Sequence, residues 1–332
     1  MLNFVLRIAS ALSIPLLLFI LPTQASAEWL REERTLMGTA VGVEIWSEDV
    51  EAGERAIGKV FDEVARLDVL MNPWNPQSGL SYINRNAASG PVAADPEIIA
   101  VVLRAQHYSE LSEGAFDISF ASVGQHFDYR QGRAPDQELL EKSLPAVDYR
   151  AIGVDAAKGT IVFNNAGLQI DLGGIAKGYA VDRGIEILLE EGIEAAVVSA
   201  GGDSRVLGNR GDRPRTIGIR HPRKPGEYAA KIPLQDTAIS TSGDYERFFV
   251  EDGVRFHHIL DPQTGQSAST VQSASVIAPL AIDSDALSTM VFVLGVERGL
   301  ALVNRLPGVD AIVIDGSGKL HYSAELLLST TP

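Results

Sequence analysis

The amino-acid sequence predicts an α+β fold in which mixed and antiparallel sheets are flanked by helices. Its first half alternates strand and helix patterns, and residues 50–70 place apolar side chains at helical spacing. Its second half contains short β-rich runs and a hairpin signal, Asp252 followed by Gly253. Because antiparallel hairpins mixed with helices do not build a doubly wound parallel sheet, the sequence favours α+β.

The elements of the first half follow from periodicity and from capping residues. Residues 39–46 alternate as a strand does, and they lead into the amphipathic helix 50–70. A second helix is expected after Asp95, because this acidic N-cap is followed by Pro96 at the first helical position. That helix should end just before Gly114. We expect the apolar faces of both helices to lie in the core.

The second half begins with an apolar run at residues 168–172, which predicts a strand. A glycine turn, a helix over 175–191 and a strand over 195–199 should follow it. Further strands are expected at residues 216–220, 238–241, 247–250, 257–260 and 273–277.

The last part of the chain is expected to hold one more helix and one more hairpin. Asp283 can cap a helix that covers residues 284–294. Strands at 311–314 and 320–323 should then pair through a turn at 315–319.

Residues 1–27 have the features of a cleavable secretory signal peptide. They contain one basic residue, Arg7, an apolar run at 11–21 and the small-residue ending Ala25-Ser26-Ala27. The unbroken apolar run is shorter than the roughly 20 residues that a membrane-spanning helix needs, so we expect no stable membrane anchor. Residues 28–332 are expected to form a single domain that is exported to the periplasm.

Composition excludes several classes of function. The formal net charge of −15 argues against a surface that binds nucleic acid or anionic lipid. The chain contains no cysteine, which excludes disulfides, thiolate metal sites and a lipid-anchored N-terminal cysteine. A soluble periplasmic protein that is not a lipoprotein fits these facts.

The segment at 171–182, DLGGIAKGYAVD, places an acid, a glycine hinge and a lysine at a predicted strand-to-helix corner. Gly173 and Gly174 let the backbone approach a ligand closely, and the helix start offers unpaired N–H groups to an anion. Lys177 adds a positive charge. The segment is not a Walker loop, which has four residues between its glycines and a Ser or Thr after the lysine. A tight turn with a solvated lysine is an alternative of equal weight.

Asp285, Ser288 and Thr289 share one face of the predicted helix 284–294. Three hard oxygens on one face suit Mg²⁺, which takes one or two carboxylates and leaves positions for phosphates and water. The alternative is an ordinary polar face whose hydroxyls bond back to the helix carbonyls.

Two histidines, His257 and His258, end a predicted strand just before a Pro/Gly turn. A histidine there can act as a general base near neutral pH. Neighbouring residues of a strand point to opposite faces, so at most one of the two faces a site. The alternative is an imidazole that packs on the sheet or lies exposed in a loop. Aromatic side chains that could cover a planar ring, or equally belong to the core, are Trp74, Phe116 and Tyr245.

Seven segments of the chain, in order, resemble the ApbE family of exported flavin transferases, the FAD:protein FMN transferases once described as thiamine biosynthesis lipoproteins. The resemblance covers nearly the whole chain after the signal, and it implies an ApbE-like, T-fold-like architecture with an FAD cleft between lobes. The segments are MGT at 37–39, GAFD at 114–117, DLGGIAKGYAVD at 171–182, GGD at 201–203, TSGDY at 241–245, HILDPQTG at 258–265 and DALST at 285–289.

The resemblance implies Mg²⁺-dependent transfer of FMN from FAD to a threonine or serine hydroxyl of an acceptor flavoprotein, such as a subunit of a respiratory or electron-transfer complex, with release of AMP. His258 would activate the incoming hydroxyl, and Lys177 would stabilise charge on the phosphate oxygens. The implied Mg²⁺ ligands are the backbone carbonyl of Gly174 and the side chains of Asp285, Ser288 and Thr289. The implied FAD-lining residues are Met37, Trp74, Ala115, Phe116, Asp117, Asp171, Lys177 and Leu260.

The chain departs from the family pattern near Trp74, where it reads WNPQSG at 74–79 and the family usually has Tyr-x-x-Asp-Ser-Glu. After Phe116 it has Asp117-Ile-Ser119 in place of Asp-Pro-Thr. Two other functions remain as alternatives. An FAD pyrophosphatase that gives FMN and AMP, with water as the acceptor, would use the same residues. A non-enzymatic periplasmic flavin-binding protein would not need the metal pair, the lysine and the histidine together.

Overall fold

An eight-stranded sheet forms the centre of the structure, a computed structural model that describes residues 27–330. The strand order is β1-β2-β6-β7-β10-β13-β14-β15, and every neighbouring pair is antiparallel. The strands are β1 Glu28–Leu36, β2 Thr39–Ser47, β6 Ala196–Ala200, β7 Asp203–Leu207, β10 Thr237–Gly243, β13 Val271–Ala278, β14 Asp310–Asp315 and β15 Leu320–Tyr322.

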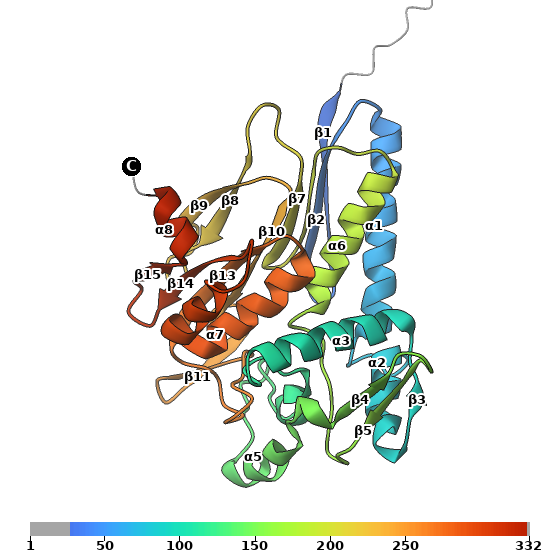
Figure 1. Ribbon diagram of the computed structural model, residues 1–332, viewed down its shortest axis with the longest axis vertical. Helices are drawn as coiled ribbons and strands as arrows, with labels where there is room; N and C mark the ends of the chain where they lie inside the picture. The colour runs from blue at the N-terminus through green and yellow to red at the C-terminus, as the bar shows by residue number, and fades with distance from the viewer. Residues whose placement is uncertain (1–26, 331–332) are drawn as a thin grey trace, which may run out of the picture.

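Three long helices cover one face of this sheet (Figure 1). Helix α1 (Val50–Met71) packs on β1 and β2, α6 (Ala176–Glu190) packs on β6 and β7, and α7 (Ala281–Val303) packs on β10 and β13. Because strand side chains alternate between faces, every second residue of β2 lies in the core between sheet and helices. The apolar face predicted for α1 is buried there, so that prediction is confirmed.

A smaller layer lies at one end of α1 and α6 (Figure 1). It contains a three-stranded antiparallel sheet of order β3-β5-β4 and several short helices, and α3 connects it to α7. Its elements are α2 Gly79–Asn86, η1 Ala87–Ser89, β3 Val92–Ala93, α3 Pro96–Leu111, η2 Ile118–Phe120, α4 Ala121–Gly124, α5 Gln137–Ser143, η3 Leu144–Ala146, η4 Tyr149–Ala151, β4 Ile152–Asp155 and β5 Thr160–Phe163.

The other face of the main sheet carries a ribbon of β8 (Arg215–Arg220) and β9 (Tyr228–Leu234) and a short helix, α8 (Ala324–Thr330). Ile219 and Leu234 of the ribbon pack with residues of the main sheet in a second, small core. A separate hairpin of β11 (Phe248–Glu251) and β12 (Val254–His257) leads into the segment that begins at His258.

Most predicted elements are confirmed. Asp95 caps α3 through Glu97 N–H at 2.8 Å, and Pro96 is its first residue. Asp252 and Gly253 have φ of 48° and 79°, so the hairpin turn takes the backbone that this residue pair favours. Strands β14 and β15 pair as expected.

Two predicted strands are wrong. Residues 168–172 form no strand, because side chains replace the partners that a neighbouring strand would supply. The amide of Asn84 exchanges both hydrogen bonds with the backbone of Ile170, at 2.9 Å each. The strand predicted at 257–260 is β12, which ends at His257; the two-residue turn at 252–253 starts it earlier.

Helix α7 is longer than the helix predicted at residues 284–294, and it has a different cap. It begins at Ala281, and Asp283 lies inside its first turn, where it pairs with Arg104 instead of capping. Gly295, with φ 77° and ψ −174°, interrupts the helix one residue after the predicted end. The chain then resumes a helical path to Val303.

By length and composition alone, α7 is the one helix of residues 27–330 that could cross a membrane. In its most apolar stretch 56% of the residues are buried, because α7 packs between the sheet and helices α3 and α6. A core helix meets the same two criteria, and burial on several sides explains its apolar character. The predicted signal segment, residues 1–27, falls almost entirely outside the described residues.

Candidate active site

Helices α6 and α7 meet at their N-termini, and each is capped by a carboxylate from the other. Neither helix has a side-chain cap of its own. Asp182 of α6 accepts hydrogen bonds from the N–H groups of Ala281 and Ile282, at 2.9 Å each. Asp285 of α7 accepts one from Gly178 N–H in the first turn of α6, at 3.0 Å. The exchange satisfies backbone donors that a helix start leaves without partners.

Gly178 makes this close approach possible. A Cβ atom at this position would lie 2.2 Å from the carbonyl oxygen of Ala281 and 2.8 Å from the Cβ of Asp285. Such distances are far inside van der Waals contact, so only glycine lets the two helix starts touch here.

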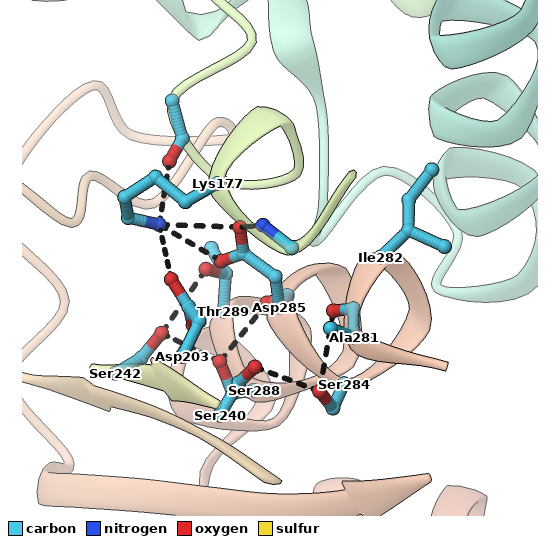
Figure 2. A network of polar contacts seen from close by, with 12 residues as sticks. Lys177, Asp203, Ser240, Ser242, Ala281, Ile282, Ser284, Asp285, Ser288 and Thr289 are labelled. Atoms are coloured by element: carbon cyan, nitrogen blue, oxygen red, sulfur yellow. Dashed lines mark hydrogen bonds and ion pairs between the residues drawn. The ribbon is translucent and has the colours of Figure 1, made fainter. Parts of the chain in front are cut away.

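Lys177 lies between two buried carboxylates (Figure 2). Its Nζ is 2.8 Å from Asp203 Oδ2 on β7, and 3.2 and 3.1 Å from the two carboxylate oxygens of Asp285. It also donates to the carbonyl of Gly173 at 3.1 Å. The structure therefore joins the predicted lysine corner to the predicted metal helix, more than 100 residues along the chain.

The charges of this cluster shift one another's protonation. Burial raises the pKa of Asp285 above its ordinary value, and the nearby Asp203 raises it further, while Lys177 and Gly178 N–H act in the opposite direction. Burial alone would lower the pKa of Lys177, but the two carboxylates raise it overall. Lys177 is therefore an ammonium ion at neutral pH.

Hydroxyl groups extend the cluster toward the sheet. Ser242 Oγ of β10 lies 2.9 Å from Ser288 Oγ and 3.1 Å from Thr289 Oγ1 (Figure 2). Ser288 also donates to the backbone carbonyl of Asp285 at 2.9 Å, which is the back-bond that the polar-face alternative predicts. Thr289 has no such back-bond within the described residues, so its hydroxyl is the freer of the two.

Gly174 completes the group of predicted ligands. A Cβ placed on it would lie 3.5 Å from Thr289 Oγ1 and 3.3 Å from the ring of Phe116. In a regular helix its carbonyl would accept from Gly178 N–H, but that donor is turned to Asp285. Within residues 27–330 the Gly174 carbonyl has no hydrogen-bond donor. Carboxylate, hydroxyl and carbonyl oxygens are the donors that Mg²⁺ prefers, so the residues fit this ion.

The two histidines have different surroundings, although His258 lies just beyond the end of β12 and not in the strand as predicted. His257 is buried, its Nε2 lies 2.7 Å from the carbonyl oxygen of Ala268, and its Nδ1 accepts from Ile259 N–H. His258 Nδ1 is buried and has no partner among the described residues. The pKa of His258 is lowered to about 3, mainly by burial and further by the nearby Arg247, His257 and Lys177. Its imidazole is therefore neutral at pH 7.

The sequence model of the ApbE family matches residues 37–313. The chain belongs to the ApbE family. It is 34% identical over 319 residues to the FAD:protein FMN transferase of Treponema pallidum (strain Nichols), covering 90% of this chain and 88% of that protein. It also resembles two solved structures. The ApbE protein of Thermotoga maritima MSB8 has a TM-score of 0.84 and 32% identity, covering 92% of this chain and all of that one. The flavin transferase ApbE of Vibrio cholerae has a TM-score of 0.80 and 27% identity, covering 91% and 99%.

Some of the FAD-lining positions implied by the ApbE resemblance lie beside the cluster. The ring of Phe116 lies beside Gly174, where it would be 3.3 Å from an added Cβ, and Ala115 before it is buried. Asp171 accepts from Gly173 N–H at 2.7 Å, and burial raises its pKa against the opposing effects of that N–H, Arg247 and Lys177. These positions surround the lysine corner.

Other residues that the resemblance places against FAD make structural contacts elsewhere or lie away from the cluster around Lys177. The carboxylate of Asp117 accepts from Ser119 N–H, Ser119 Oγ and Tyr149 N–H, so it fixes its own loop. The side chain of Leu260 packs in a separate small core with Val123 and Leu140. Trp74 is 71% exposed in the loop between α1 and α2. Their contact with FAD stays a prediction.

Met37 has a φ of 51°, which non-glycine residues seldom adopt, and its N–H donates to Asp68 Oδ2 at 2.9 Å. The other oxygen of Asp68 accepts from Asn72, whose own side chain accepts from Trp74 N–H. A short chain of hydrogen bonds thus connects the two implied FAD residues Met37 and Trp74.

Sequence reasoning gave no role to Asp203, Ser242 or Asp68. Asp203 and Ser242 lie in segments quoted for the resemblance, GGD at 201–203 and TSGDY at 241–245. Strand alternation shows which neighbours share a face, but not which face meets the helices. Asp68 carries no motif, and only the fold brings it to Met37.

Proposed function

We propose that this protein is an FAD:protein FMN transferase, which transfers FMN from FAD to a threonine or serine hydroxyl of an acceptor flavoprotein and releases AMP. The observation that supports this most strongly is the convergence of Lys177, Asp285, Thr289 and Gly174 in one buried polar cluster of an ApbE-family chain. Cleavage of a pyrophosphate needs positive charge beside the phosphates. In a protein that is acidic overall, Lys177 would supply part of it, and a cation held by the cluster's oxygen atoms would supply the rest.

Mg²⁺ is the metal in this proposal. Asp285, Thr289 and the carbonyl of Gly174 would hold it, with Ser288 as a weaker candidate. When bound there, the ion would neutralise the pyrophosphate and stabilise AMP as the leaving group. The donor set supports this choice, since all four are hard oxygens.

The residues of the chain would handle the proton and the phosphate charge. The acceptor hydroxyl attacks the phosphorus on the FMN side, and the bond from that phosphorus to the bridging oxygen breaks. AMP leaves with the bridging oxygen, and the hydroxyl proton passes to neutral His258. Lys177 would hold negative charge on the phosphate oxygens. The free Nδ1 of His258 supports its role as the proton acceptor. The lowered pKa keeps the imidazole unprotonated at neutral pH, but it also makes the imidazole a weaker base than an ordinary histidine.

The names of the curated relatives support the transferase over the two alternatives. The relatives from Treponema pallidum (strain Nichols) and from Vibrio cholerae, the latter 30% identical over 318 residues, are both called FAD:protein FMN transferase. Neither carries the name of a hydrolase or of a flavin carrier.

We also propose that the protein is exported to the periplasm as a soluble enzyme and meets its acceptor there. The support is the signal-like sequence of residues 1–27 and the absence of cysteine for a lipid anchor. The acceptor would be a flavoprotein subunit of a respiratory or electron-transfer complex, as the resemblance implies.

One incubation separates the candidate functions. The purified protein is mixed with FAD, Mg²⁺ and a candidate acceptor domain, and intact-mass spectrometry follows the acceptor. We expect the acceptor to gain the mass of FMN less one water, with an equal amount of AMP. Free FMN and AMP without a covalent adduct would instead identify an FAD pyrophosphatase. Bound flavin that is never cleaved would identify a binding protein.

A further inference from the structure

Lys177 occupies the place between Asp203 and Asp285 where a cation is needed. Both carboxylate side chains are almost fully buried, with exposed fractions of 3% and 4%, whereas that of Lys177 is 25% exposed. Two buried carboxylates repel each other strongly unless a positive charge lies between them. The ammonium group lies within 3.2 Å of oxygens from both, so it is the counter-charge that lets them coexist.

The cluster is still one positive charge short. Within residues 27–330, Lys177 is the only basic side chain within 4.0 Å of either carboxylate. With both carboxylates ionised, one ammonium against two negative charges leaves a net charge of −1 in a poorly solvated place. The cluster therefore attracts a further cation, which is the electrostatic requirement of a metal site.

A metal ion and Lys177 nevertheless compete for the same oxygens. Both oxygens of Asp285 accept from Lys177, and Oδ2 also accepts from Gly178 N–H. An ion bound to Asp285 must take a lone pair that Lys177 now holds. The ammonium group then keeps its shortest contact, the 2.8 Å ion pair with Asp203.

The position of Asp203 is fixed, so its carboxylate can retain the ammonium group of Lys177. Its backbone lies at the start of β7, paired with Ala200 on one side and with Ser240 on the other. The preceding corner is tight, since a Cβ at Gly202 would lie 2.6 Å from the carbonyl oxygen of Thr241. The backbone of Asp203 is therefore fixed by its pairing with both neighbouring strands.

We infer that Lys177 is the resident cation of the ion-free site, and that Asp203 is a positioning residue that retains the ammonium when Mg²⁺ displaces it from Asp285. The inference rests on the proposed metal site. In the loaded enzyme Lys177 stays beside the ion, tethered by Asp203, with its remaining N–H donors turned to the substrate phosphates. A metal-bound state would thereby prepare the lysine for FAD.

The test is a calorimetric titration of Mg²⁺ into the metal-free full-length protein without FAD, so that it reads metal affinity and not turnover. We expect Lys177→Met to bind Mg²⁺ about tenfold more tightly than wild type, because its competitor is gone. We expect Asp203→Asn to bind about tenfold more weakly, because one charge is lost and the ammonium remains on Asp285. Lys59→Met, which removes an exposed lysine paired with Glu191, is the control for net charge and should match wild type.

A thermal-unfolding series adds a second readout. In EDTA, Lys177→Met should melt below wild type, and Mg²⁺ should raise its melting temperature more than that of wild type. A variant that folds only with Mg²⁺ would be the strongest form of this rescue. If Lys177→Met cannot be purified at all, the Mg²⁺ titration of Asp203→Asn alone tests the inference.

The outcomes are distinct. Unchanged or weaker Mg²⁺ binding by Lys177→Met, or unchanged binding by Asp203→Asn, overturns the inference and leaves the proposed transferase untouched. Wild-type protein that binds no Mg²⁺, or Asp285→Ala that binds it as wild type does, overturns the proposed metal site and this inference with it.

Discussion

Asp182 and Asp285 cap each other's helices. The carboxylate of Asp182, on α6, receives the first two N–H groups of α7, and the carboxylate of Asp285, on α7, receives Gly178 N–H of α6. Asp182 is also paired with Arg205 at 2.8 Å. The candidate active site is thus built at a junction that fixes the helix bearing Asp285 and Thr289 relative to the helix bearing Lys177.

The junction predicts a large loss of stability when the side chain of Asp182 is removed. Asp182→Ala leaves two helix N–H groups and the guanidinium of Arg205 without their buried acceptor, so we expect a loss of about 3 kcal/mol in the free energy of unfolding. Asp182→Asn keeps the shape and one carbonyl acceptor and should lose less. Urea denaturation followed by circular dichroism measures both. A loss below about 0.5 kcal/mol in Asp182→Ala, as for an ordinary surface change, would contradict the capping role.

Gly178 should not tolerate even one methyl group. Gly178→Ala places a Cβ against the Ala281 backbone and pushes the two helix starts apart, which should cost about 2 kcal/mol or more of unfolding free energy. Gly58→Ala, inside α1 with open space around its Cβ position, is the matched control. That change should stabilise by about 0.5 to 1 kcal/mol, since alanine favours helix. Equal effects at the two sites would show that the contact between α6 and α7 is not tight.

His258 gives the stability a specific pH dependence. Its pKa is lowered to about 3 in the folded protein, against 6.5 for an ordinary histidine. Below pH 6.5 the imidazole of His258 binds a proton in the unfolded chain but not in the folded protein. The free energy of unfolding therefore falls as the pH falls from about 6.5 toward 3. The variant His258→Gln has no imidazole to protonate, so it should not show this loss of stability. Between pH 7 and pH 5 the difference in unfolding free energy should shift by about 2 kcal/mol in favour of the variant.

Urea denaturation of wild type and His258→Gln at both pH values measures that shift. The same change at the exposed His107 serves as the control and should give no comparable difference. A wild-type-to-variant difference that is the same at pH 5 and pH 7 would show that His258 is not held neutral by its surroundings.

Trp74 should report FAD binding by fluorescence. It is 71% exposed without ligand, and the ApbE resemblance places it against the flavin, whose stacking would quench the indole. Titration of FAD should quench the protein strongly, and Trp74→Phe should remove most of that quenching. Trp46→Phe, at the end of β2 and 39% exposed, should retain it. Quenching that survives in Trp74→Phe would place this loop away from the flavin.

The sequence predicts well what depends on near neighbours. Asp285 and Thr289 lie four residues apart, so a helix alone puts them on one face. Asp95 and Pro96 start α3 as their types suggest, and the Asp252-Gly253 turn forms the expected hairpin. The family resemblance adds that Gly174 and Lys177 belong to the same site as the distant helix.

The features that could not be predicted from the sequence depend on contacts between distant parts of the chain. Asp283 has the type and position of an N-cap, but Asp182, some hundred residues earlier, supplies the cap. Residues 168–172 have the apolar run of a strand, yet the side chain of Asn84 takes the hydrogen bonds of a neighbouring strand. Asp203 became a site residue only when the sheet placed its carboxylate beside Lys177.

The central claim is that the cluster around Asp285 performs Mg²⁺-dependent FMN transfer. Asp285 and Asp283 lie on the same helix, but only Asp285 contacts Lys177 and Gly178. Asp283 pairs with Arg104, so Asp283→Ala is the control for Asp285→Ala. The decisive measurement is the amount of acceptor that gains covalent FMN from FAD and Mg²⁺, by intact-mass spectrometry, with folding of both variants checked by circular dichroism. We predict that folded Asp285→Ala forms no adduct while Asp283→Ala labels the acceptor as wild type does. Full labelling by Asp285→Ala at ordinary magnesium concentrations would contradict the account.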